Sequence, residues 1–228
     1  MARIGYGYGS EWHLLRFLGR HREHLNVAVA ASTGAAAIQW LDFAFDPSEW
    51  SGDRELQGLE FIDDRQVLDA WESFWPQTGR LMHWDAIGLL STPGGATEWL
   101  LVEAKGNIEE LRSKCGAKEE GRRIIGEAFA AVQADMAVAV GAEAWLDGYY
   151  QHANRLATLR FLLASGVPTR LLYIYFCGDA TPDRTCPADE EGWRPSIEEM
   201  HKHLGLTGQS EIESRAHELF IPVAGPME

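Results

Sequence analysis

Residues 81–105, LMHWDAIGLLSTPGGATEWLLVEAK, decide the fold of this chain. Two strand-like runs, residues 81–90 and 97–105, flank the turn-forming segment STPGGA. Glycine and proline between apolar runs favour a tight reversal of the backbone. We therefore predict an antiparallel hairpin centred on Gly94, in which residues equally far from Gly94 along the two strands face each other.

This register brings three ionisable side chains together. Asp85 falls opposite Glu103, and strand alternation puts Glu103 and Lys105 on one face, with Ala104 on the other. Directly opposed residues have Cβ atoms about 5 Å apart. A bulge at the turn would shift the register by one residue, so the convergence depends on a regular hairpin.

Two carboxylates this close repel each other unless something neutralises them. Mg²⁺ or Mn²⁺ does so with hard oxygen ligands, and the carbonyl of Ala104 could add a further ligand. Lys105 could position or deprotonate a water and stabilise developing negative charge. The alternative is that Asp85 is a strand-edge charge and that Glu103 and Lys105 form an ordinary ion pair. The apolar run WLLV directly before Glu103 favours a functional pair, because an unpartnered carboxylate there would be costly.

The rest of the chain supplies elements for a layered domain. We predict helices at residues 11–22, 64–75, 108–115, 119–136, 143–164 and 196–204, strands at 36–45, 57–62, 169–176 and 219–223, and a long loop at 178–195. This order indicates an α/β protein, a three-layer α/β/α domain with a mixed central sheet. No linker composition separates parts of the chain, so residues 1–228 are predicted to form a single domain.

Composition limits the class of protein. In 228 residues with 46% hydrophobic content, no apolar run approaches the roughly 18 to 20 residues that a membrane span needs. The first residues lack the apolar region of a signal peptide. Three cysteines cannot all pair within one chain, and we expect them to be reduced. We therefore expect a soluble, cytoplasmic protein with no membrane partner.

Charge gives a mixed indication about nucleic acid. The formal net charge is −14, whereas phosphate binding depends on Lys and Arg. The acids are concentrated in residues 42–72 and 179–228, and a basic cluster follows the hairpin: Arg112, Lys114, Lys118, Arg122 and Arg123. This basic cluster could face phosphate, but a solvated helix face, which is the commoner role of surface charge, is the favoured alternative.

The arrangement of Asp85, a turn, and Glu103-Ala104-Lys105 on a second strand, after an N-terminal helix and strand, resembles the PD-(D/E)XK nuclease superfamily. The resemblance covers about residues 10–176 and implies a restriction-endonuclease-like core. It also implies that Asp85 and Glu103 bind Mg²⁺ (or Mn²⁺) and that Lys105 assists catalysis. In that superfamily an acidic residue on the first helix often joins the metal site, and Glu11 is the matching residue.

Two positions depart from the superfamily pattern. Trp84 stands where the motif has its proline. In some exonuclease-like branches a glutamine is followed four residues later by tyrosine, whereas here Gln151 is followed by Arg155, which puts assignment to such a branch in doubt.

Polar residues recur at helical spacing within residues 147–158, opposite the apolar stripe of that helix. From this set we predict substrate contacts to phosphate or base edges by Gln151, Asn154 and Arg155. A solvated polar face is the alternative.

The function expected from these residues is metal-dependent hydrolysis of phosphodiester bonds in nucleic acid, with DNA favoured over RNA. Two alternatives stay open: a non-catalytic member of the same fold that serves as a protein-interaction or regulatory module, and an enzyme acting on a small phosphorylated metabolite. A homodimer is compatible with each of them.

Overall fold

The central sheet of the molecule has five strands in the order β1-β4-β5-β6-β7. The computed structural model describes residues 7–41, 55–79 and 81–224. β1 (Ala37–Leu41), β4 (Ala86–Ser91) and β5 (Thr97–Lys105) are antiparallel neighbours. β6 (Thr169–Cys177) and β7 (Ala216–Pro222) continue the sheet in parallel with β5. The sheet is therefore mixed, as predicted.

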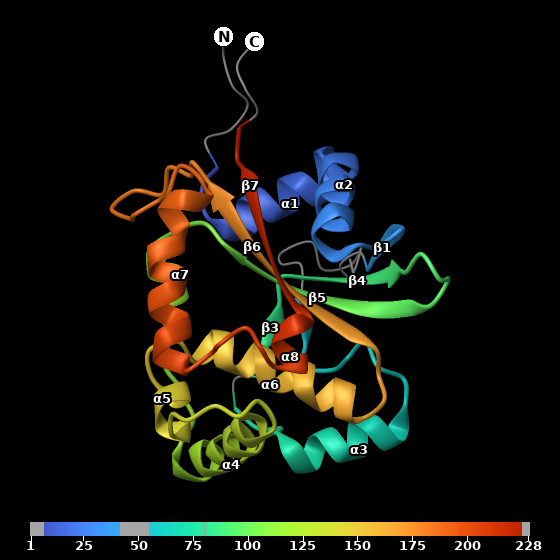
Figure 1. Cartoon of the computed structure of the whole chain (residues 1–228), viewed down its shortest axis with the longest axis vertical. Coiled ribbons are helices and arrows are strands. Elements are labelled where there is room, and N and C mark those ends of the chain that lie inside the picture. The colour runs from blue at the N-terminus through green and yellow to red at the C-terminus, as the bar shows by residue number, and fades with distance from the viewer. Residues whose placement is uncertain (1–6, 42–54, 80, 225–228) are drawn as a thin grey trace, which may run out of the picture.

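Helices cover both faces of this sheet (Figure 1). α1 (Ser10–Arg20) and α2 (Arg22–Thr33) pack on the face that carries Val102 and Ala104. The opposite face packs mainly against α6 (Tyr150–Ala164), with α4 (Glu119–Asp135) beyond it. α3 (Arg65–Phe74), α5 (Ala142–Leu146), α7 (Glu190–Leu204) and α8 (Glu211–Ser214) complete that layer. The predicted three-layer α/β/α architecture is confirmed.

The hairpin register agrees with the prediction. β4 and β5 pair from Ala86 opposite Val102 to Ser91 opposite Thr97, which is symmetrical about Gly94. The turn is closed by hydrogen bonds between Thr92 and both Gly95 and Ala96. Gly95 has φ 83°, a conformation that glycine adopts without steric cost.

The predicted strand at residues 81–90 is interrupted at Asp85. β3 (His83–Trp84) leaves the main sheet and pairs with β2 (Leu56–Gln57) in a separate two-stranded ribbon. The Trp84 indole N–H donates to the Gly58 carbonyl at 2.8 Å, which fastens this ribbon from within. Asp85 therefore lies at the bend between two sheets.

Several helix predictions were wrong in extent. The helix predicted at 143–164 is divided into α5 and α6 at Gly148, where φ is 95°. Residues 108–115 form only a short 3₁₀ turn, η1 (Ile108–Leu111). α7 begins within the predicted loop because the side chain of Asp189 caps its first turn. α2 and α8 were not predicted, and residues 42–45 of the strand predicted at 36–45 lie outside the described residues.

Within the described residues, no helix is both long and apolar enough to cross a bilayer.

Candidate functional site

Glu103 and Lys105 lie at the carboxyl end of β5 and point toward α6. Their side chains share one face of the strand, and both are buried, with 1% and 8% of their surface exposed. Lys105 Nζ lies 2.5 Å from Glu103 Oε1. Alternation along an extended strand produces this pairing directly, because the intervening Ala104 points into the other layer.

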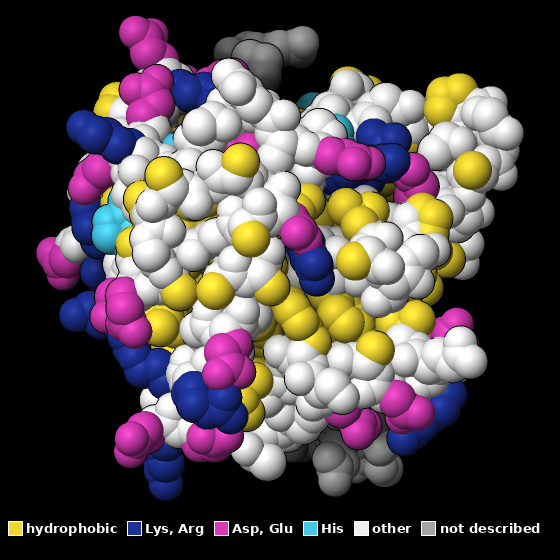
Figure 2. Space-filling view, turned by 60° about the horizontal axis from the view of Figure 1, so that its bottom comes forward, with side chains coloured by type: hydrophobic (Ala, Val, Ile, Leu, Met, Phe, Trp, Pro, Cys, Tyr) yellow, Lys and Arg dark blue, Asp and Glu magenta, His cyan; other side chains and the backbone are white. Residues whose placement is uncertain are grey.

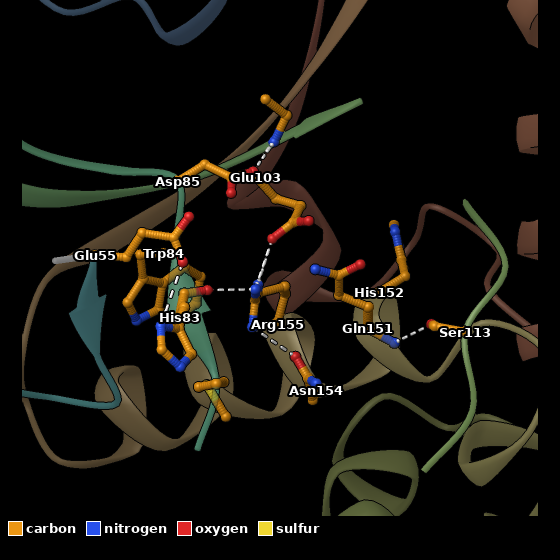
Figure 3. A network of polar contacts seen from close by, with 12 residues as sticks. Glu55, His83, Trp84, Asp85, Glu103, Ser113, Gln151, His152, Asn154 and Arg155 are labelled. Atoms are coloured by element: carbon orange, nitrogen blue, oxygen red, sulfur yellow. Dashed lines mark hydrogen bonds and ion pairs between the residues drawn. The ribbon is translucent and has the colours of Figure 1, made fainter. Parts of the chain in front are cut away.

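Asp85 approaches the same end of β5 from the neighbouring strand. It directly precedes Ala86, the first residue of β4 that pairs with β5, and it lies close enough to Glu103 for the two carboxylates to interact. Its Oδ2 accepts a hydrogen bond from the Ala104 backbone N–H at 2.6 Å. Figure 3 shows Asp85 beside Glu103, so the two acids predicted to be neighbours are adjacent.

Helix α6 contributes the polar residues predicted for substrate contact. Gln151 Oε1 accepts from Lys105 Nζ at 2.8 Å. Arg155 Nε donates to Glu103 Oε2 at 2.8 Å, and Asn154 Oδ1 accepts from Arg155 Nη1 at 3.0 Å. Asn154 and Arg155 are only 5% and 2% exposed. Helix α6 therefore carries these residues to the acid pair, where they bind neighbouring protein groups.

The remaining polar residues of the helical pattern do not join this group. Asp147 lies after α5 and pairs with Arg122 at 3.2 Å, while the Thr158 hydroxyl lies 3.2 Å from Met82 Sδ. The break at Gly148 separates Asp147 from α6, so the helical spacing assumed for residues 147–158 does not extend to Asp147.

The two positions that depart from the superfamily pattern contact each other. The Arg155 guanidinium carbon lies 4.5 Å from the centroid of the Trp84 ring, within the range of a cation–π interaction. Arg155 Nη2 also donates to the His83 carbonyl at 2.5 Å. The Trp84 ring thus supplies a surface on which the arginine rests.

Burial and charge act differently on the two acids. Burial and the neighbouring Glu103 carboxylate raise the pKa of Asp85 to about 7, against the opposing effects of Lys105, the Ala104 N–H and Arg155. Burial also disfavours the charged form of Glu103, but Arg155 and Lys105 outweigh it and lower the Glu103 pKa. Glu103 is therefore the firmly ionised member of the pair, and Asp85 is the member whose charge depends on its surroundings.

Glu11, the predicted third metal ligand, lies on α1, which packs on the other face of the sheet. Among the described residues it makes no hydrogen bond or ion pair to Asp85, Glu103 or Lys105. Its exposed side chain lines a surface depression together with Tyr8, Trp12, Leu15 and Glu110. A metal-binding role for Glu11 stays a prediction.

The donor set offers a divalent cation few protein ligands. Among residues 7–41, 55–79 and 81–224, no three His, Cys, Asp or Glu side chains are grouped so as to hold a metal ion. Asp85 and Glu103 supply two carboxylates, and the Ala104 carbonyl points to the same side as the N–H that binds Asp85. Mg²⁺ commonly binds proteins through one or two carboxylates and keeps several waters, so this set fits Mg²⁺ or Mn²⁺.

The basic cluster after the hairpin is largely neutralised. Arg112 pairs with Glu199, Arg122 with Glu143 and Asp147, and Arg123 with Glu120 and Glu127. In the described part of the chain, Lys114 and Lys118 are the members of the cluster without an ion pair. Figure 2 shows Lys and Arg side chains interspersed with Asp and Glu over the face that it presents. This pattern favours a solvated helix face over a phosphate-binding surface.

Sequence reasoning missed a second buried polar group on the opposite side of the sheet. Asp179, directly after β6, accepts hydrogen bonds from the Gly9 N–H at 3.1 Å and the Thr181 hydroxyl at 2.5 Å, and lies 2.7 Å from the His13 ring nitrogen. These contacts fasten the start of α1 to the end of β6. The bonded residues are up to 170 positions apart in the sequence, so no local sequence pattern could predict these contacts.

Comparison of the chain with protein-family models, with curated proteins and with solved structures gives no significant match. The functional assignment therefore rests on the geometry around Asp85, Glu103 and Lys105.

Proposed function

We propose that this chain is a Mg²⁺- or Mn²⁺-dependent nuclease that hydrolyses phosphodiester bonds in nucleic acid, with DNA as the favoured substrate. The observation that supports the proposal is the adjacency of Asp85 and Glu103 at the end of β5, with the Lys105 ammonium 2.5 Å from Glu103. Paired carboxylates can hold such a cation, and a neighbouring lysine can stabilise the charge that develops on the phosphate.

The cation would supply Lewis-acid polarisation of a phosphoryl oxygen and a lowered pKa for an attacking water. Asp85 and Glu103 would hold it. Lys105 carries three N–H donors, of which Glu103 and Gln151 bind two. The third donor is left to stabilise negative charge that develops on the phosphate. Gln151 fixes the direction of this ammonium group.

A specific observation favours the non-catalytic alternative. Both oxygens of Glu103 already bind cationic side chains, Oε1 with Lys105 and Oε2 with Arg155. Such a centre has its counter-charges without a metal ion. Calorimetric titration with MnCl₂ separates the two readings, because a nuclease must bind the ion, whereas the absence of binding would overturn the proposal and support the regulatory module.

The activity test compares cleavage of single-stranded DNA, duplex DNA and RNA with and without MgCl₂ or MnCl₂. Lys105→Ala is expected to lower the cleavage rate by about 100-fold or more, because it removes a preorganised charge at the phosphate. Lys202→Ala is the matched control, since Lys202 is exposed on α7 and lies outside both the site and the basic cluster. Equal rates for native protein and Lys105→Ala would exclude this mechanism, and cleavage of only small phosphate esters would point to the metabolite alternative.

The cellular setting is part of the same proposal. We place the protein in the cytoplasm, which is supported by the free thiols of Cys115, Cys177 and Cys186, since disulfides are rare in that compartment. Sedimentation analysis at several concentrations would establish whether the chain forms a homodimer.

A further inference from the structure

Arg155 is held more completely than a substrate-binding arginine needs to be. Its Nε donates to Glu103 Oε2 at 2.8 Å, and its Nη2 forms an ion pair with the same oxygen at 2.7 Å. Nη2 also binds the His83 carbonyl, Nη1 binds Asn154, and the planar face lies over Trp84. Figure 3 shows Arg155 and Glu103 pointing toward each other from α6 and β5. Each of the three guanidinium nitrogens, and one face of the group, therefore contacts the protein.

The charges around the acid pair balance without a metal ion. When ionised, Asp85 and Glu103 carry two negative charges, and Lys105 and Arg155 carry two positive charges. All four lie at one end of β5, and Glu103 and Arg155 are almost fully buried. A buried unpaired charge costs several kcal/mol, so the negative charges of this acid pair would destabilise the folded protein unless positive charges lay beside them. Arg155 provides half of that compensation.

The same contacts limit the space for cations. Oε2 of Glu103 is occupied by Arg155, and Oε1 by Lys105. Asp85 Oδ2 accepts from Ala104, whereas Asp85 Oδ1 makes no hydrogen bond among the described residues. Each Glu103 oxygen keeps one lone pair for a cation, whereas Asp85 Oδ1 has no protein partner among the described residues, so the more open position is on the Asp85 side of the pair, away from Arg155.

We propose that Arg155 is a resident counter-cation of the centre: it neutralises Glu103 while no metal is bound and restricts the site to one divalent cation, held on the Asp85 side. The inference rests on the cation site of the proposed function. It gives Arg155 a positioning role in place of the substrate contact predicted from helical spacing.

Titration of the purified chain with MnCl₂, followed by calorimetry and by electron paramagnetic resonance, tests this role. The native chain is expected to bind one Mn²⁺. Arg155→Gln removes the charge and keeps an amide donor, and its Kd for Mn²⁺ is expected to fall about tenfold, because a nearby positive charge no longer repels the ion. Arg155→Lys keeps the charge without the planar fork, and its Kd is expected to stay near the native value.

Arg160→Gln is the matched control, because Arg160 lies on the same helix and pairs with the exposed Asp135. It should leave the Kd unchanged. Binding of two Mn²⁺ ions by the native chain, or an Arg155→Gln Kd equal to or above the native value, would overturn the inference. Should Arg155→Gln fail to fold in metal-free buffer, MnCl₂ but not NaCl of equal ionic strength is expected to restore folding, and failure of MnCl₂ to do so also overturns it.

The results separate this inference from the nuclease proposal. A tenfold change in Kd together with no cleavage of any nucleic acid would leave Arg155 as a counter-cation and remove the nuclease. Metal-dependent cleavage together with an unchanged Kd in Arg155→Gln would support the nuclease and remove the counter-cation role of Arg155. Absence of Mn²⁺ binding in both the native chain and Arg155→Gln would remove both.

Discussion

Glu103 carries the electrostatic balance of the site at the scale of a single residue. Its carboxylate is 1% exposed and bridges Lys105 on its own strand and Arg155 on α6. Removing it leaves two buried cations facing each other, whereas the native arrangement compensates both. The resulting loss of folding stability therefore exceeds the loss caused by removing an ordinary surface ion pair.

Glu103→Ala is accordingly expected to lower the free energy of unfolding by roughly 3–5 kcal/mol, the range for breaking a buried charge pair. Urea-induced unfolding at neutral pH measures it. Glu98→Ala is the control, because Glu98 also bridges two arginines, Arg170 and Arg215, but these are 20% and 34% exposed at their side chains. Glu98→Ala should lower the free energy of unfolding by less than Glu103→Ala does. Equal decreases for the two variants would contradict the assignment of a buried charge balance to Glu103.

At this scale the sequence could predict only what a strand and a turn determine locally. The reversal at Gly94 and the two-residue period of a strand were enough to bring Asp85, Glu103 and Lys105 together. The Arg155–Glu103 contact could not be predicted, because it depends on where α6 crosses the sheet. That position is set by the break at Gly148, which apolar spacing alone did not reveal.

At the scale of elements, the placement of α1 depends on a close backbone approach. Gly106 directly follows Lys105, and a Cβ added there would lie 2.9 Å from the Ser10 nitrogen and 3.1 Å from Asp179 Oδ2. The first of these is a backbone atom and cannot move aside without shifting the start of the helix. Glycine is therefore required where β5 leaves the sheet beneath α1.

Gly106→Ala is expected to destabilise the fold by about 1–3 kcal/mol through overpacking. Thermal unfolding of the variant measures the loss. Gly116→Ala is the control, since an added Cβ there meets nothing within 4 Å. If both variants unfold at the native temperature, the close packing of α1 on β5 described above is incorrect.

Elements with strong local signals were predicted closely, and those defined by tertiary contacts were not. β5 matches its predicted bounds at Thr97–Lys105, and α3 has a true cap, since the Asp64 side chain accepts from the Gln66 and Val67 N–H groups. α2 has only a weak apolar stripe, with Leu25 and Val29 as its buried aliphatic residues, so its sequence carried little helical signal. Its stability comes from packing on the sheet.

At the scale of the whole molecule, buried titratable groups couple folding to pH with opposite signs. His152 stacks on Tyr173 with ring centroids 4.3 Å apart, and burial, then His201 and Lys105, hold its pKa well below 6.5. Below pH 6.5 the unfolded chain binds a proton here that the folded chain does not, so this group lowers stability on acidification. Asp85 has the opposite effect, because its folded pKa of about 7 lies above the ordinary 3.8. Between these two values the folded chain binds a proton that the unfolded chain does not, so acidification through this range stabilises the fold.

His152→Phe, which keeps a ring against Tyr173, is expected to remove the His152 contribution. Relative to the native chain, its free energy of unfolding should rise by up to about 1.4 kcal/mol for each pH unit below pH 6.5. Urea unfolding at several pH values between about 7 and 5 measures the difference. The exposed His24, changed to Phe, is the control, and parallel pH profiles for native and His152→Phe would refute this assignment.

Whole-molecule charge also bears on how nucleic acid would bind. Because three arginines of the basic cluster are already ion-paired, Lys114 and Lys118 are its members left to neutralise phosphates. The logarithm of the DNA-binding constant is therefore expected to fall with the logarithm of salt concentration with a slope of only about −2. Fluorescence anisotropy at several salt concentrations tests this, and a slope steeper than about −5 would show that the cluster releases its acids to bind DNA.

The contact between Trp84 and Arg155 has a consequence for how this chain can change over evolutionary time. Because the guanidinium rests on the indole while it binds Glu103, loss of the ring would remove one of the contacts that orient Arg155, and loss of the arginine would uncover one face of a buried indole. The two positions, one on β3 and one on α6, should therefore be inherited as a pair. A homologue with proline at the first position is expected to lack arginine at the second.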